Sequence, residues 1–182
     1  MNRFDYFETD NKLRIVIYSR VSVFVKIILG ILVLFSIIGF FGVIFKLTTG
    51  ESMKPTNIGI SFAVFTLILI FTGRLFLWNS FGKEILTFDN GNFSFQYDYK
   101  LYKSELEQRD YENVVARVNS DQIDSHEINN VIDDNLINNN WSEGKLELVL
   151  KKENYISQIK LSKDDLINII NTINDFNKNK KL

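Results

Sequence analysis

Two long apolar stretches constrain this chain more than any other feature of its sequence. They are Val21–Phe45 and Ile58–Trp78, and their central runs, Ile27–Phe45 and Ile58–Gly73, contain no charged residue. About 20 apolar residues of helix cross the hydrocarbon core of a bilayer. Neither stretch has the polar face that a surface helix of a soluble protein shows. We therefore predict a hairpin of two transmembrane helices, at about 21–45 and 58–78.

The rest of the chain divides into a short segment before the hairpin and a longer one after it. We assign residues 1–20 to an N-terminal segment, 21–79 to the hairpin and 80–182 to one small domain. A cleaved signal peptide has an apolar core of roughly 7–15 residues close to the N-terminus. The first apolar stretch is too long and begins too late for that, so we expect a retained helix.

Basic residues gather at one end of the predicted hairpin. The residues that we expect to anchor it there are Arg20, Lys26, Arg74 and Trp78. Long cationic side chains can extend into the headgroups, and tryptophan favours the interface. An intramembrane site for an anionic group is the alternative for Lys26 and Arg74, but their places near the helix ends favour anchors. The loop Lys46–Asn57 has less positive charge, so the positive-inside rule predicts cytoplasmic termini and location in the inner (cytoplasmic) membrane.

Small residues near the far end of the hairpin favour close packing of its two helices. Gly39 and Gly42 lie in the first helix, and Gly59 and Ala63 form a small-xxx-small pair in the second. Such pairs let the backbones of membrane helices approach each other. We expect them to meet within the hairpin, and dimerisation is the alternative.

Alternation of apolar and polar residues predicts strands on both sides of the hairpin. The segment before it, Lys12–Arg20, needs a partner for its backbone amides, so we expect Leu13–Tyr18 to pair with an edge of the later sheet. The alternatives are a cytoplasmic extension of the first helix and an interfacial strip. The strands expected after the hairpin are Glu84–Phe88, Asn92–Tyr99, Leu101–Glu107, Asn113–Asn119, Lys145–Lys151 and Asn154–Leu161. Asn90-Gly91 predicts a tight turn between the first two.

The end of the sequence predicts one amphipathic helix. Ser162 and Asp165 have the spacing of a capping box, which marks a helix start. An apolar stripe follows at helical spacing, made of Leu166, Ile169, Ile170, Ile173 and Phe176. We therefore predict an α+β membrane protein, with a two-helix transmembrane hairpin followed by an antiparallel sheet or barrel and one C-terminal helix.

Three segments of the chain carry a resemblance to a known family. They are Trp78-Asn-Ser-Phe-Gly-Lys-Glu-Ile-Leu86 directly after the hairpin, Gly144-Lys-Leu-Glu-Leu-Val-Leu150, and Ile159-Lys-Leu-Ser162 before the last helix. The chain resembles bacterial two-span membrane proteins with a cytoplasmic PH-like (pleckstrin-homology-like) domain, a family of uncharacterised function. The resemblance implies a PH-like sheet closed by the C-terminal helix. The chain lacks the basic cluster that phosphoinositide-binding PH domains use, and it has an asparagine-rich insertion at 120–141.

The insertion contains His126, the one histidine of the chain, among several acidic residues. One imidazole with carboxylates can bind a cation. The spacing matches no metal loop, including the acidic calcium loop. We interpret 120–141 as a solvated insertion and predict no metal site and no cofactor.

Composition excludes several classes of function. The chain has no cysteine, and its single histidine leaves no base for a serine nucleophile, so we predict that it is not an enzyme. From Gly82 onward 13 basic residues stand against 18 acidic ones, which excludes a nucleic-acid footprint. The predicted partners are the lipid bilayer and an unknown protein. Three functions stay open: a membrane-anchored protein-interaction or scaffold module, a sensor of anionic lipid or of membrane state, and an immunity or defence factor against a membrane-active toxin.

Overall fold

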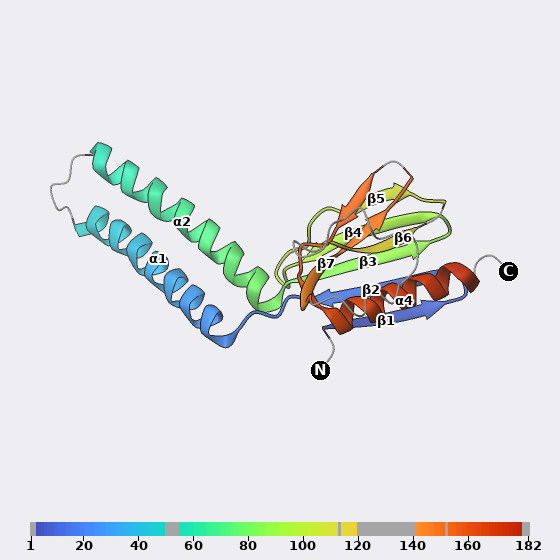
Figure 1. Cartoon of the computed structure of the whole chain (residues 1–182). Coiled ribbons are helices and arrows are strands. Elements are labelled where there is room, and N and C mark those ends of the chain that lie inside the picture. The colour runs from blue at the N-terminus through green and yellow to red at the C-terminus, as the bar shows by residue number, and fades with distance from the viewer. Residues whose placement is uncertain (1–2, 50–54, 113, 120–140, 152, 180–182) are drawn as a thin grey trace. The chain divides into compact units, whose positions relative to one another are not determined.

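The computed structural model describes residues 3–49, 55–112, 114–119, 141–151 and 153–179 (Figure 1). These residues form two compact units. The helical unit contains residues 20–82 and 99–101, and the sheet unit contains residues 1–19, 83–98 and the chain from 102 onward. The predicted insertion 120–141, with His126, lies outside the described residues except for Trp141.

The helical unit consists of two long helices that pack along each other, α1 (Val23–Thr49) and α2 (Pro55–Phe81). Both predicted segments are helical: α1 begins two residues later and ends four residues later than predicted, and α2 extends three residues beyond each predicted end. Their apolar side chains are largely exposed, and both helices are long and apolar enough to cross a membrane.

Aromatic rings, and not pairs of small residues, fill the contact between α1 and α2. A Cβ atom added to Gly39 would lie 2.3 Å from the Phe65 ring, so this glycine makes room for that ring. A Cβ atom on Gly42 or Gly59 would meet no atom within 4 Å. The predicted approach of small residues is therefore wrong, because Gly42 and Gly59 face open space and the Phe65 ring occupies the close contact.

The first sheet of the sheet unit has the order β1-β2-β3-β4-β5, with every neighbouring pair antiparallel. Its strands are β1 (Phe4–Thr9), β2 (Lys12–Tyr18), β3 (Lys83–Asp89), β4 (Asn92–Asp98) and β5 (Glu107–Asp110). The β3–β4 turn has positive φ at both Asn90 (43°) and Gly91 (87°), which confirms the predicted tight turn.

Strands β2 and β3 pair along their whole length although α1 and α2 separate them in the chain. The register runs from Lys12 opposite Asp89 to Tyr18 opposite Lys83. This confirms that the segment before the first helix joins the sheet. The expected pairing with an edge is also confirmed, because β3 is the edge of the sheet formed by the later strands, β3-β4-β5. Strand β1 then pairs with the other side of β2, so β2 lies inside the five-stranded sheet.

Two parts of this sheet differ from the strands expected from the sequence. Strand β1 was not predicted, because it buries one side chain, Phe4, and therefore shows no alternation. The predicted continuous strand Leu101–Glu107 is wrong, since this segment has only an isolated bridge from Lys103 to Asp98 before regular pairing with β4 begins at Glu107. Lys100 has φ 73° and turns the chain away after β4, and Leu101 and Leu106 lie exposed.

The second sheet has the order β6-β7-β8, and β9 also pairs with β7. Its strands are β6 (Val115–Asn119), β7 (Glu143–Val149), β8 (Asn154–Ile156) and β9 (Leu161–Ser162). The single strand predicted for Asn154–Leu161 is therefore divided. The chain leaves the sheet at Ser157, whose hydroxyl accepts from the Leu146 amide and donates to the Ile159 carbonyl.

The core of the sheet unit lies between the two sheets and under helix α4 (Lys163–Asn179). Tyr155 of β8 packs on Phe95 and Phe93 of β4, with ring centroids 4.7 and 5.3 Å apart. The apolar stripe of α4 is buried throughout, and the helix packs on β6, β7 and β9. Ser162 accepts from the Asp165 amide at 3.3 Å, which confirms the capping box.

Candidate functional site

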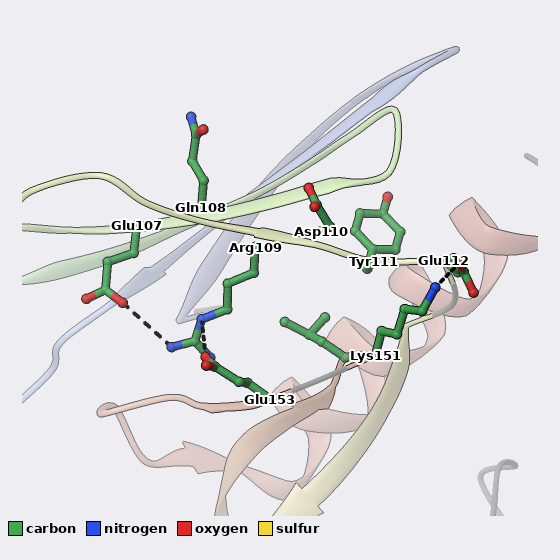
Figure 2. Close-up of a pocket in the computed structure, with 9 residues that line it drawn as sticks. Glu107, Gln108, Arg109, Asp110, Tyr111, Glu112, Lys151 and Glu153 are labelled. Carbon is green, nitrogen blue, oxygen red and sulfur yellow. Dashed lines mark hydrogen bonds and ion pairs between the residues drawn. The ribbon is translucent and has the colours of Figure 1, made fainter.

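A groove of about 600 Å³ lies along strand β5 in the sheet unit (Figure 2). Its lining residues come from β5 and the chain that follows it, and from the connection between β7 and β8. They are Glu107, Gln108, Arg109, Asp110, Tyr111, Glu112, Leu150, Lys151 and Glu153. All four residues of β5 contribute, although successive side chains of a strand point to opposite faces. The groove therefore meets the strand along its edge.

The edge of β5 is open among the described residues. This strand ends the five-stranded sheet and pairs with β4 on one side only. An edge strand presents unpaired N–H and C=O groups to which another extended chain can pair. The groove thus combines a hydrogen-bonding strand edge with flanking side chains, which is the arrangement used in β-strand addition.

Arg109 lines the groove and extends from β5 toward Glu153 (Figure 2). It lies opposite the buried Phe93 in the register of β4 and β5, so its side chain points between the two sheets. Its Nη1 donates to the Asn154 carbonyl at 3.0 Å, and its guanidinium lies 5.1 Å from the centre of the Phe95 ring. Arg109 therefore links the edge of the first sheet to β8 of the second.

Two carboxylates share the charge of Arg109. Its Nε lies 3.4 Å from the Glu153 carboxylate and its Nη2 lies 3.6 Å from that of Glu107. Lys151 forms a second ion pair in the groove, with Glu112. Four acidic residues and two basic ones line the groove, so a net negative charge remains. This charge favours a basic ligand.

A second polar cluster lies between the two sheets, around Glu84. This residue is fully buried on β3, on the face that carries Leu86 and Phe88. Its Oε1 accepts from the backbone amides of Gln158 at 2.5 Å and Ile159 at 3.2 Å. Burial raises the pKa of Glu84 to about 7, and these amides together with the Tyr155 hydroxyl partly oppose the rise.

The Glu84 cluster organises the fold and is closed to ligands. Its carboxylate binds the turn between β8 and β9 and so joins this turn to the first sheet. Burial and the Glu84 charge raise the pKa of Tyr155, which stays a neutral phenol. The role of Glu84 was not predicted from the sequence. The available indication was an acid at an inward position of an alternating strand, but its partners lie more than 70 residues away in the chain.

The four predicted anchors all belong to the helical unit, at the end where α1 begins and α2 ends. Arg20 precedes α1, Lys26 lies in its first turn, and Arg74 and Trp78 lie in the last turns of α2. The Arg74 guanidinium lies 5.7 Å from the centre of the Tyr99 ring, and the Trp78 ring lies 5.0 Å from it. Arg74 and Trp78 are four residues apart on α2, and Tyr99, which was predicted only as part of a strand, contacts both.

The described residues contain no group of three histidine, cysteine, aspartate or glutamate side chains that could hold a metal ion. Comparison with protein-family models, with curated proteins and with solved structures gives no match. The function must therefore be argued from the groove and from the two apolar helices.

Proposed function

We propose that the protein is a membrane-anchored interaction module: α1 and α2 cross the inner membrane, and the sheet unit receives an extended, basic segment of a partner protein. The observation that carries the proposal is the open β5 edge along an acidic groove. Its role is binding rather than catalysis, because Arg109 and Lys151 are engaged in ion pairs with neighbouring acids.

The place of the two helices in the sequence supports the membrane anchor. They are inserted between β2 and β3, which are neighbouring strands of one sheet. A soluble domain would join such neighbours with a short turn. Here two helices with largely exposed apolar surfaces take its place. Burial of those surfaces in lipid removes their contact with water.

A PH-like fold for the sheet unit is supported by the order of its elements. Antiparallel strands form two sheets that pack face to face through Tyr155, Phe93 and Phe95, and an amphipathic C-terminal helix covers the core. This is the order implied by the resemblance of Trp78–Leu86, Gly144–Leu150 and Ile159–Ser162. The fold is a scaffold only, and the binding role rests on the groove itself.

Reversing charge in the groove is the direct test of this function. We expect the double variant Asp110→Lys, Glu112→Lys to capture the partner from solubilised membranes at least about tenfold less well than the natural chain, because like charges across an interface repel. The measurement is quantitative mass spectrometry of proteins retained by the tagged full chain. Asp175→Lys is the matched control, since Asp175 lies exposed on α4.

The two groove carboxylates are on the surface, so the double variant should keep its fold and its melting temperature. A folded double variant that retains the same proteins in the same amounts as the Asp175→Lys control would contradict the groove as the binding site. A protein that both variants fail to retain would depend on the overall charge of the domain and not on the groove.

The orientation in the membrane is a separate prediction. We propose that both termini are cytoplasmic, because Arg20, Lys26 and Arg74 gather at that end of the hairpin. The chain has no cysteine, so single cysteines can be placed freely. In intact cells we expect an impermeant thiol reagent to label Ser52→Cys and to reach Ser142→Cys only after the cytoplasmic side is opened. The opposite pattern would reverse the topology.

A further inference from the structure

The short segment Tyr99–Leu101 belongs to the helical unit, although the strand before it, β4, belongs to the sheet unit. This segment, which we call the interface loop, packs on the last two turns of α2. Tyr99 is buried there between Arg74 and Trp78. The Lys100 ammonium lies 4.5 Å from the centre of the Phe81 ring, over the last residue of α2.

The depth of these contacts follows from the length of α2. At about 1.5 Å per residue, this helix is roughly 40 Å long, whereas the hydrocarbon core is about 30 Å thick. A centred helix therefore leaves about 5 Å at each end among the headgroups. Trp78 and Phe81 lie in that zone. Arg74 lies about one turn deeper, from where a long cationic side chain can reach the headgroups. Tyr99 contacts both Trp78 and Arg74, so the interface loop lies at the level of the headgroups.

The exposed side chain of the interface loop, Leu101, is suited to a position at the level of the lipid headgroups. Leu101 is 76% exposed, among the most exposed large apolar residues of the described chain. It follows a lysine and a tyrosine, and the three residues together combine an apolar tip, a cation and an aromatic ring. Cations with long stems and aromatic rings are the side chains that favour the membrane interface.

The backbone of Lys100 provides an independent indication. Its φ of 73° is a left-handed conformation that glycine, asparagine and aspartate adopt far more readily than lysine. Glycine would satisfy the turn without strain. Lysine at this position keeps a cation over the Phe81 ring, next in the chain to Tyr99, whose ring contacts Arg74.

We propose that the interface loop is a lipid-contact site: Leu101 enters the bilayer interface and Lys100, with Arg74, binds the phosphate of anionic phospholipids. The inference rests on the proposed membrane anchor. The interface loop would be a third attachment to the bilayer, besides the two helices, and its strength would depend on the charge of the lipid. The module would thereby bind its membrane more firmly where anionic lipid is abundant.

Spin labels on single cysteines in the full chain test the site. The chain is reconstituted into vesicles of phosphatidylcholine, with or without phosphatidylglycerol, and carries a label at Leu101, Phe35 or Ile156. Collisions with lipid-soluble oxygen and with a water-soluble nickel complex report depth. Phe35 is an exposed residue of α1 and Ile156 an exposed residue of β8. We expect the Leu101 label to contact lipid, more often in the anionic vesicles, and the Ile156 label to contact water.

Lys100→Gly removes the cation and suits the positive φ of the turn, so the variant should fold. Any change in lipid contact then comes from loss of the cation. In anionic vesicles we expect it to lower the ratio of inserted to exposed Leu101 label about fivefold, the effect of one lysine near an anionic surface. Lys178→Ala, which removes one charge from the end of α4, should leave this ratio unchanged.

Each other outcome overturns a defined part of the argument. A Leu101 label as accessible to nickel as the Ile156 label would overturn the lipid contact, and equal insertion with and without phosphatidylglycerol would overturn the anionic preference. A Leu101 label shielded from both reagents would mean that protein covers the loop. If the Phe35 label contacts water, the membrane anchor fails instead.

Discussion

Deletion of residues 1–19 is expected to prevent folding of the sheet unit, although the deleted segment lies before the two long helices. It contains β1 and β2. Leu13, Ile15 and Ile17 of β2 are all fully buried. Loss of one such side chain typically costs about 2–5 kcal/mol. Loss of three exceeds the free energy of unfolding of many whole domains, about 5–15 kcal/mol.

The measurement is resistance to protease and the cooperative thermal unfolding of the detergent-solubilised chain. A matched variant keeps β1 and β2 but replaces residues 20–81 with Asn-Gly. Ser19 and Gly82 then continue the β2–β3 register beyond the pair Tyr18–Lys83, and a two-residue turn can close them. We expect this variant to fold in buffer without detergent.

The two shortened chains together separate the roles of the strands and the helices. If the chain without residues 1–19 unfolds as cooperatively as the Asn-Gly variant, then β1 and β2 are dispensable and the β2–β3 pairing does not stabilise the sheet unit. If neither folds, the sheet unit depends on the helices themselves. The expected result is folding of the Asn-Gly variant alone.

Much of this sheet could be predicted from the sequence because its strands bury one face. Alternation placed Lys12–Arg20, Glu84–Phe88 and Asn92–Tyr99 close to the observed β2, β3 and β4. The last helix was predicted from the Ser162 capping box and its apolar stripe. In each case the spacing of apolar residues along the chain matches the repeat of the strand or helix, so these residues fall on the face that packs in the core.

The missed elements lack such a local pattern. Strand β1 is held by its pairing with β2 and has a single buried side chain, so composition alone gave no indication of it. The segment Leu101–Glu107 alternates without being a continuous strand, because the chain turns at Lys100 and only Lys103 then forms a bridge to β4 before Glu107. Alternation indicates a strand only where a partner is available.

The groove could not be predicted because it is formed by residues far apart in the chain. Arg109 and Asn154 are 45 residues apart, and they meet only because β5 and β8 end their sheets side by side. The anchors Arg74 and Trp78 were chosen from charge and position, but their common contact with Tyr99 depends on a turn in another segment. Tertiary contacts of this kind leave no periodicity.

The stability of the sheet unit is expected to fall by about 3 kcal/mol between pH 4.5 and pH 7, through the single carboxyl group of Glu84. Burial raises its folded pKa from 4.5 to about 7, whereas the unfolded chain returns it to the ordinary value. Each pH unit of difference corresponds to about 1.4 kcal/mol. The folded state holds the proton more tightly, so the stabilising effect is complete below pH 4.5 and is lost as the pH rises through 7.

Glu84→Gln should remove this dependence and leave the contacts in place. The glutamine oxygen can still accept from the Gln158 and Ile159 amides, and its amide group can donate to the Tyr155 hydroxyl. We expect the variant to match the natural chain within about 1 kcal/mol at pH 5, the contribution of a typical hydrogen bond. At pH 8 it should be about 3 kcal/mol more stable, because no charge is buried.

Urea unfolding at pH 5, 6, 7 and 8 measures the difference, with the buried Trp141 as the fluorescent reporter and Trp78 replaced by phenylalanine in every protein compared. Glu8→Gln, at an exposed residue of β1, is the control and should differ from the natural chain by the same amount at each pH. If the free energies of unfolding of Glu84→Gln and the natural chain differ by the same amount from pH 5 to 8, then Glu84 keeps one protonation state over this range. If this difference grows between pH 5 and 7 and then stays constant, Glu84 is the titrating group. The contact between the β8–β9 turn and the first sheet is then weaker at neutral pH than in mild acid.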